Sequence, residues 1–209
     1  HSHPDPSSID EGREVLETLK QEGKIRAYGI STHDPKVVEQ LVERNAVDVV
    51  MFPQSLLTHC SQLLNLVKEQ GLGGIVRGAL ESGWLSGRYF HQQPKFSEQD
   101  IRSIYYPPLN PQKCAVYERF LPEGVPMTAF ALRYLLDFDT THTIVIGGKS
   151  IEHYRDALKG LELPQVELKT HKALHQIRQR LYLDPLGVRI LRRVNGYISR
   201  SIRRLVKIK

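Results

Sequence analysis

The chain has 209 residues, 40% of them hydrophobic and 25% charged, which is the composition of an ordinary globular protein. It has no apolar run near the roughly 20 residues that a membrane-spanning helix needs, and we expect no signal peptide, because no apolar core follows the first residues. Cys60 and Cys114 lie far apart and lack metal or redox spacing. Composition thus argues against an integral membrane protein or a disulfide-rich secreted domain. It predicts free thiols, no metal site and a cytoplasmic location.

Signals for helices and strands alternate from residue 8 to residue 76. Ser8 and Glu11 form the pattern of a capping box at the start of a helix. Pro35, after Asp34, is expected at the first position of the next helix. In chain order, the pattern predicts a helix over 8–23, a strand over 25–30, a helix from 34 through 42, a strand over 47–52, a helix over 61–69 and a strand centred on 74–76.

The second part of the chain contains an extended excursion and a fourth strand–helix unit. Residues 81–122 form the excursion, and a long connection there is expected on a functional face. A strongly apolar helix over 127–136 follows, begun by Pro126. A strand over 144–146 and a helix after Ser150 complete the unit.

Each of the four predicted strands is short, apolar and followed by a helix. This alternation indicates a parallel α/β sheet that helices cover on both sides. In β/α barrels and open α/β sheets, ligands bind at the carboxyl ends of the strands. Four such units are half of an eight-unit barrel. They would leave two open sheet edges, at the first and fourth strands, and open edges favour self-association.

The segment TIVIGGKS, residues 143–150, has the character of a phosphate site. Backbone N–H groups at a helix start attract anions, glycines let the backbone approach a ligand, and Lys149 and Arg155 add two charges. A P-loop is ruled out, because its first glycine would fall at Thr143. The alternative is an ordinary strand-to-helix turn with a surface lysine.

From residue 1 to about residue 160, the chain contains motifs that resemble those of the aldo/keto reductase family and follow one another in the family's order. GKIRAYGIST at 23–32 resembles the family's fifth-strand signature, and GWLSGRY at 83–89 resembles the loop after the seventh strand. ALRYLL at 131–136 resembles the helix before the eighth strand. Lys149-Ser150, with an arginine six residues after the lysine, resembles the site for the adenosine 2′-phosphate.

The resemblance implies a (β/α)8 TIM barrel that reduces an aldehyde or ketone with NADPH. The family's catalytic Asp, Tyr and Lys would lie upstream, so the chain is expected to be a fragment or truncated product: about strands 5–8 with their helices over 1–165, then a helical extension over 166–209. His1 would take the place of the catalytic His, with His3 as the alternative register. Such a polypeptide is expected to hold the cofactor but, by itself, not to turn over substrate.

The resemblance also assigns cofactor contacts. Ser31 would contact the nicotinamide carboxamide, the loop over 80–87 would lie over the pyrophosphate, and Arg77 takes the position of a stacking aromatic. The full set is Ser31, Thr32, Arg77, Leu80, Gly83, Leu85, Gly87, Gly147, Lys149, Ser150 and Arg155.

Departures from the family pattern favour a second hypothesis, a non-catalytic nucleotide-binding or interaction module. Thr32 stands where the family often has Asn, Met51 where a Gln is common, and Gln54-Ser55 where a Tyr-Asn pair is common. Methionine cannot donate a hydrogen bond to a carboxamide.

The basic charge of the chain lies in its tail. Residues 185–209 contain eight Lys and Arg and no acid, so the tail contributes +8 to a net charge of +6 and the rest carries −2. Apolar residues recur there at three- and four-residue spacing, which predicts a basic amphipathic helix over 188–209. This helix would either contact an anionic membrane surface peripherally or pack on the barrel. We expect a small-molecule carbonyl substrate and no nucleic-acid partner, and the oligomeric state stays open.

Overall fold

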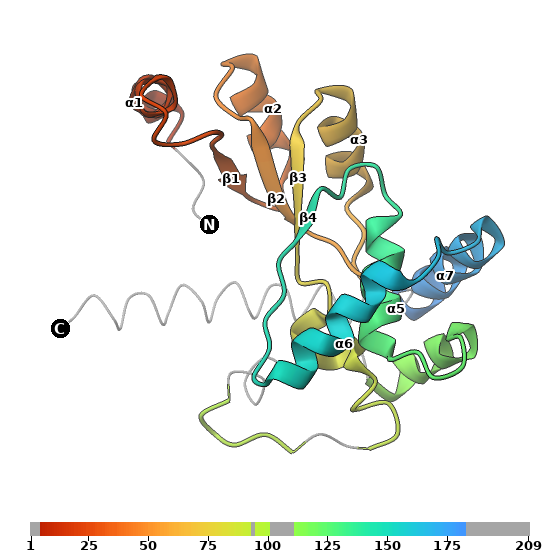
Figure 1. Cartoon of the computed structure of the whole chain (residues 1–209). Coiled ribbons are helices and arrows are strands. Elements are labelled where there is room, and N and C mark those ends of the chain that lie inside the picture. The colour runs from red at the N-terminus through yellow and green to blue at the C-terminus, as the bar shows by residue number, and fades with distance from the viewer. Residues whose placement is uncertain (1–4, 93–94, 101–110, 183–209) are drawn as a thin grey trace.

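The computed structural model describes residues 5–92, 95–100 and 111–182. The predictions for His1, His3 and residues 188–209 lie outside these ranges. The described chain forms one parallel sheet with helices packed beside it (Figure 1).

The sheet has four parallel strands in the order β1-β2-β3-β4, as the sequence predicted. The strands are β1 (Gly29–Ser31), β2 (Val49–Pro53), β3 (Gly73–Arg77) and β4 (Thr143–Ile144). Ser31 pairs with Met51, and Pro53 pairs with Arg77. Among the described residues β1 and β4 are the outer strands of the sheet.

The helices agree with the prediction most closely in the middle of the chain. The α-helices are α1 (Ile9–Gln21), α2 (Pro35–Glu43), α3 (Ser61–Glu69), α5 (Met127–Leu136), α6 (Ile151–Glu162) and α7 (Leu168–Tyr182). The bounds of α3 and α5 are those predicted. Pro35 begins α2, and the Asp34 carboxylate caps it by accepting the Lys36 N–H at 3.0 Å.

Two predicted features near the amino end of the described chain are wrong. Ser8 makes no capping hydrogen bond, because a 3-10 turn, η1 (Pro6–Ser8), precedes α1 and the Ser8 hydroxyl donates to the Asp5 carbonyl at 2.9 Å. The first strand begins at Gly29 rather than at residue 25. The Ile25 N–H donates to the Leu19 carbonyl at the end of α1 and is therefore unavailable to the sheet.

Within the part of the chain that the structure describes, helices cover one face of the sheet, not two as predicted. Val50, Phe52 and Val76 are fully buried in a core shared with α2, α3 and α5. Met51 and Ile75, which pair with each other and point to the other face, are partly exposed. Burial along β2 and β3 thus alternates residue by residue, although the sequence of both strands is nearly continuously apolar.

The last three helices pack together, with α6 and α7 both in contact with α5. Most of α5 is buried, and α6 packs along it. A Cβ atom at Gly160 would lie 2.7 Å from the Ala129 carbonyl oxygen, so this close approach requires glycine. The third helix, α7, adds Leu174 to the core, and the Arg178 guanidinium donates to the Tyr134 hydroxyl at 3.1 Å.

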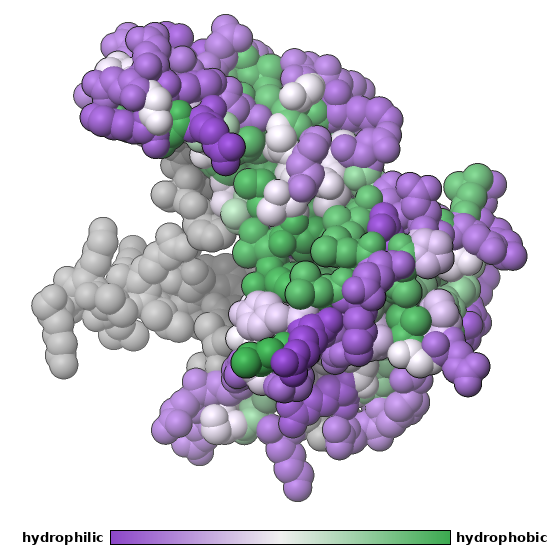
Figure 2. Space-filling view, viewed as in Figure 1, coloured by the Kyte–Doolittle hydropathy of each residue, from purple (hydrophilic) through white to green (hydrophobic). Residues whose placement is uncertain are grey.

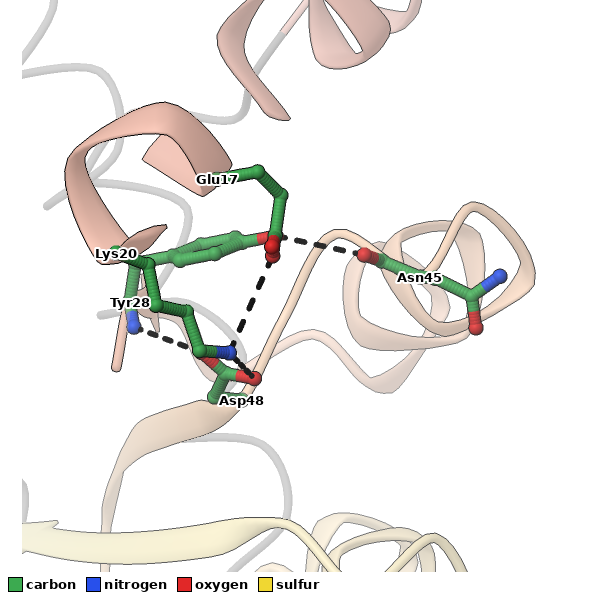
Figure 3. A network of polar contacts seen from close by, with 5 residues as sticks. All are labelled: Glu17, Lys20, Tyr28, Asn45 and Asp48. Carbon is green, nitrogen blue, oxygen red and sulfur yellow. Dashed lines mark hydrogen bonds and ion pairs between the residues drawn. The ribbon is translucent and has the colours of Figure 1, made fainter. Parts of the chain in front are cut away.

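A polar network joins α1 to the start of β2 (Figure 3). Lys20 Nζ lies 2.9 Å from both carboxylate oxygens of Asp48, and the Tyr28 N–H donates to the same carboxylate at 3.1 Å. The Tyr28 hydroxyl donates to Glu17 at 2.7 Å. Burial and the Glu17 carboxylate raise the pKa of Tyr28 to about 12, so it stays a donor at any physiological pH.

The excursion after β3 contains two 3-10 segments, η2 (Glu81–Ser86) and η3 (Pro111–Phe120). Cys114 and Tyr117 of η3 are fully buried, and the Tyr117 hydroxyl donates to the Leu56 carbonyl at 3.1 Å. The segment therefore packs on the loop after β2.

Candidate functional site at the carboxyl edge of the sheet

The predicted site residues on β1, β3 and after β4 lie along the carboxyl edge of the sheet. This is the border formed by the carboxyl ends of the strands, not one of the two outer strands. Ser31 ends β1, Arg77 ends β3, and the Val145 N–H continues the pairing beyond β4 by donating to the Val76 carbonyl at 2.8 Å. Since all four strands are parallel, Gly147 and the start of α6 leave the sheet at the same edge as Ser31 and Arg77. Ligands of open and closed α/β sheets bind at this edge.

Thr32, directly after β1, is engaged within the protein. Thr32 is buried, its N–H donates to the Met51 carbonyl at 3.0 Å, and its hydroxyl accepts the Asp34 N–H at 3.0 Å. The hydroxyl thus belongs to the turn that starts α2. Asp34 serves the same helix start as its cap.

Arg77 presents a buried polar atom at this edge. Its Nε is buried and has no hydrogen-bond partner among the described residues. Its carbonyl accepts the Gln54 N–H at 3.2 Å, which ties the loop after β2 to the end of β3. A buried donor without a partner costs free energy unless a bound group satisfies it, so this atom can donate to a polar ligand.

Backbone hydrogen bonds and backbone dihedral angles shape the loop that contains Leu80, Gly83, Leu85 and Gly87. Leu85 is fully buried, and its N–H donates to the Leu80 carbonyl, as does the Gly83 N–H. The backbone and the glycines of this loop are therefore the groups that can meet a ligand. Gly87 has a φ of 84°, and a Cβ there would lie 3.2 Å from Met127 Cβ.

A carboxylate holds this loop against the preceding one. The hydroxyls of Ser55 and Thr58 donate to Glu81 Oε1 at 2.5 and 2.6 Å. Glu81 and Ser82 have φ values of 47° and 57°, which non-glycine residues rarely adopt. The hydrogen bonds fix a backbone turn that would otherwise be unfavourable. No sequence signal distinguished Glu81, because its partners are more than twenty residues away.

The start of α6 contains the predicted phosphate-binding residues. The Lys149 side chain is exposed, with Nζ 3.9 Å from Asp100 Oδ2. The Arg155 guanidinium is exposed as well, with Nη1 3.7 Å from Glu152 Oε1. Ser150 is the N-cap residue of α6, and a Cβ at Gly147 would meet open space. Lys149, just before α6, and Arg155, within it, are thus two exposed cations near this helix start, and their binding of a phosphate stays a prediction.

Other side chains at the start of α6 were not anticipated. The Lys149 N–H donates to His153 Nδ1 at 3.1 Å, and the Gly148 N–H donates to the Tyr154 hydroxyl at 3.1 Å. Helical spacing could have flagged Glu152, which stands three residues before Arg155 and in the first turn.

Within the described ranges, no group of three or more His, Cys, Asp or Glu side chains is placed to hold a metal ion. In the same part of the chain, no helix is long and apolar enough to cross a membrane.

Comparison with known proteins shows which family the chain resembles. The model of the aldo/keto reductase family matches residues 1–179. The uncharacterized oxidoreductase YqkF of Bacillus subtilis is 28% identical over 169 residues, covering 80% of this chain and 55% of the relative. The NADH-specific methylglyoxal reductase of Escherichia coli is 24% identical over 166 residues, covering 71% and 48%.

A solved structure supports the same relationship. The apo form of the aldo-keto reductase AKR11C1 from Bacillus halodurans is 28% identical and superposes with a TM-score of 0.65, covering 85% of this chain and 59% of that one. The chain spans about half the length of the curated relatives that it matches. The family model covers most of the chain, and the chain therefore belongs to the aldo/keto reductase family.

Proposed function

We propose that the chain is the cofactor-holding part of an oxidoreductase that reduces an aldehyde or ketone to an alcohol, with NADPH as the hydride donor. The observation that carries the proposal is the collection of Ser31, Arg77 and the Gly147–Arg155 segment at one edge of the sheet. The family match supports the oxidoreductase class.

The residues at this edge fit a nicotinamide dinucleotide. The buried Arg77 Nε offers a donor that the described residues leave unused, and the planar guanidinium can stack on a ring. The loop over 80–87 presents backbone and glycines, as a pyrophosphate requires. Lys149 and Arg155 offer a point charge and a bidentate fork to a 2′-phosphate. When bound, the cofactor supplies the hydride, and these residues orient it.

We also propose that β1–β4 correspond to strands five to eight of a (β/α)8 barrel, over residues 1–165, with 166–209 as an appended extension in a cytoplasmic protein. The partly exposed sheet face with Met51 and Ile75 supports this, because that face would line the inside of a closed barrel. On this proposal His1 has a catalytic role, and the 209-residue chain by itself binds cofactor without turnover.

A second candidate function is nucleotide binding without catalysis. Gln54 favours it. The family often has a Tyr here, but Gln54 is fully buried, with Nε2 3.2 Å from His59 Nδ1 and Oε1 accepting the Cys60 N–H. Its amide is therefore engaged within the loop. Contact of residues 188–209 with an anionic membrane surface would belong to this function.

The single tryptophan provides the test of cofactor binding. Trp84 lies in η2, in the loop assigned to the pyrophosphate, and is buried against Tyr89. We expect NADPH to quench Trp84 fluorescence saturably in the full chain, with energy transfer to the reduced nicotinamide. If neither NADPH nor NADH changes the emission saturably, and calorimetry detects no binding either, the proposal is wrong.

The 2′-phosphate assignment has its own test. Lys149→Ala should weaken NADPH binding about three- to tenfold and leave NADH binding nearly unchanged, because only NADPH carries the phosphate. Lys159→Ala is the matched control, since Lys159 is an exposed lysine within α6, the helix that Lys149 precedes, and it is paired with Asp156. Equal effects of Lys149→Ala on the two cofactors would contradict the assignment.

A further inference from the structure

The donors that a phosphate would need at the start of α6 are already engaged within the protein. The Gly148 N–H donates to the Tyr154 hydroxyl and the Lys149 N–H to His153 Nδ1, both at 3.1 Å. The acceptors are side chains of the first turns of α6 itself. An incoming phosphate therefore finds no unoccupied backbone donor at these two positions.

Glu152 puts a negative charge in the first turn of α6. Its own backbone N–H and the Ser150 hydroxyl, both hydrogen-bond donors, hold the pKa of Glu152 below its usual range. Glu152 is therefore an anion at neutral pH. The same carboxylate lies 3.7 Å from the Arg155 guanidinium, so it stands beside one of the cations of the predicted phosphate set.

The cation on the other side of the turn also has an acidic neighbour. Asp100, whose side chain is mostly buried, lies 3.9 Å from Lys149 Nζ. Each of the two predicted phosphate-binding cations thus has a carboxylate beside it. The carboxylates already provide the negative charge that a 2′-phosphate would bring.

The two nicotinamide cofactors respond differently to a carboxylate at this position. A ribose 2′-hydroxyl can donate a hydrogen bond to it, as acidic residues do for NAD in other dinucleotide sites. A 2′-phosphate dianion is repelled by it and must compete with it for Arg155.

We propose that Glu152 is the residue that sets the choice between NADPH and NADH, by occupying the 2′-phosphate position with its own carboxylate and accepting the 2′-hydroxyl of NADH. The inference rests on the cofactor site of the proposed function. With Glu152 in place, the preference for NADPH over NADH given by Lys149 and Arg155 is weakened.

The test is a pair of binding titrations on the full chain, with NADPH and NADH as probes and Trp84 emission as the readout. Glu152→Gln keeps the size of the side chain and removes its charge. We expect it to tighten NADPH binding about three- to fivefold and to weaken or leave unchanged the binding of NADH, so that the ratio of dissociation constants moves toward NADPH. Glu162→Gln, at the far end of α6, is the matched control and should leave the ratio unchanged.

The outcomes separate the two proposals. If neither cofactor binds the unmodified chain, the proposed cofactor site fails, and the role of Glu152 fails with it. If both bind but Glu152→Gln leaves the ratio as it was, or shifts it no more than Glu162→Gln does, only the role of Glu152 is overturned. Circular dichroism of Glu152→Gln shows whether α6 keeps its structure, and a second variant, Glu152→Ala, should move the ratio in the same direction.

Discussion

The ring of His59 lies in a setting that disfavours its charged form. Burial, the Arg178 guanidinium and His175 lower the pKa of His59 from 6.5 to about 4. Gln54 Nε2 lies 3.2 Å from His59 Nδ1, and the ring of Phe138 lies 6.0 Å away. A neutral imidazole accepts the amide hydrogen bond, whereas a protonated one adds a second cation beside a buried arginine.

This arrangement predicts a pH dependence of stability at the scale of one residue. Between pH 6.5 and pH 4 the unfolded chain binds a proton at His59 and the folded chain does not, so the free energy of unfolding falls as the pH falls through this window. Asparagine cannot titrate, so the free energy of unfolding of His59→Asn should fall less between pH 7 and pH 4 than that of the unmodified protein. The difference should be roughly 1 to 2 kcal/mol, allowing for the exposed part of the ring. Urea unfolding at a series of pH values measures the difference, and parallel curves for the two proteins would contradict it.

At the scale of the element, the packing of α6 on α5 depends on one glycine. A methyl group at Gly160 meets the Ala129 carbonyl oxygen at 2.7 Å, and a backbone atom cannot move aside as a flexible side chain can. We expect Gly160→Ala to destabilise the fold by about 1 to 3 kcal/mol in urea unfolding, and to weaken NADPH binding because α6 carries the cofactor residues.

A second glycine gives the matched control for Gly160→Ala. Gly12 lies in α1, and no atom lies within 4 Å of the place that a methyl group would take there, so Gly12→Ala gains helix propensity without a clash. It should stabilise the protein by about 0.5 to 1 kcal/mol. If Gly160→Ala proves as stable as Gly12→Ala, the packing of α6 on α5 does not depend on glycine at position 160, and the prediction is wrong.

The elements differ in how well the sequence specified them. Helix α3 and helix α5 have their predicted bounds, because a period of apolar residues defines each of them and Pro126 also marks the start of α5. The start of β1 was predicted too early, because the Ile25 N–H donates to the end of α1 and this contact has no sequence signature. The one-sided burial of the sheet depends on what covers each face, which apolar periodicity does not record.

The candidate site also contains some residues that the sequence could predict and others that it could not. Lys149, Ser150 and Arg155 could be predicted as site residues because charge, hydroxyl and helix start are adjacent in the sequence. Asp100 and Glu81 were missed, since each meets its partner through the folding of the excursion after β3. Local chemistry is readable from a motif, whereas the groups that modulate it come from other loops.

At the scale of the whole molecule, apolar side chains remain uncovered beside the β4 edge. Figure 2 shows hydrophobic residues gathered in the middle of this face, over the region of β3 and β4. Ile151, Leu158 and Leu161 stand along α6 at helical spacing, and each is more than half exposed. An exposed edge strand together with an apolar surface of this kind favours association with another chain.

We therefore predict that the 209-residue chain by itself forms dimers or larger species at tens of micromolar concentration. Sedimentation velocity over a concentration series measures this, and a monodisperse monomer throughout would contradict it. Replacing both Leu158 and Leu161 by Lys should shift the distribution toward monomer, because it removes apolar area from α6. Glu162→Lys adds the same positive charge on the same helix without removing apolar area. If the charge alone disperses the protein, the two variants behave alike; if the apolar face drives association, only the double variant does so.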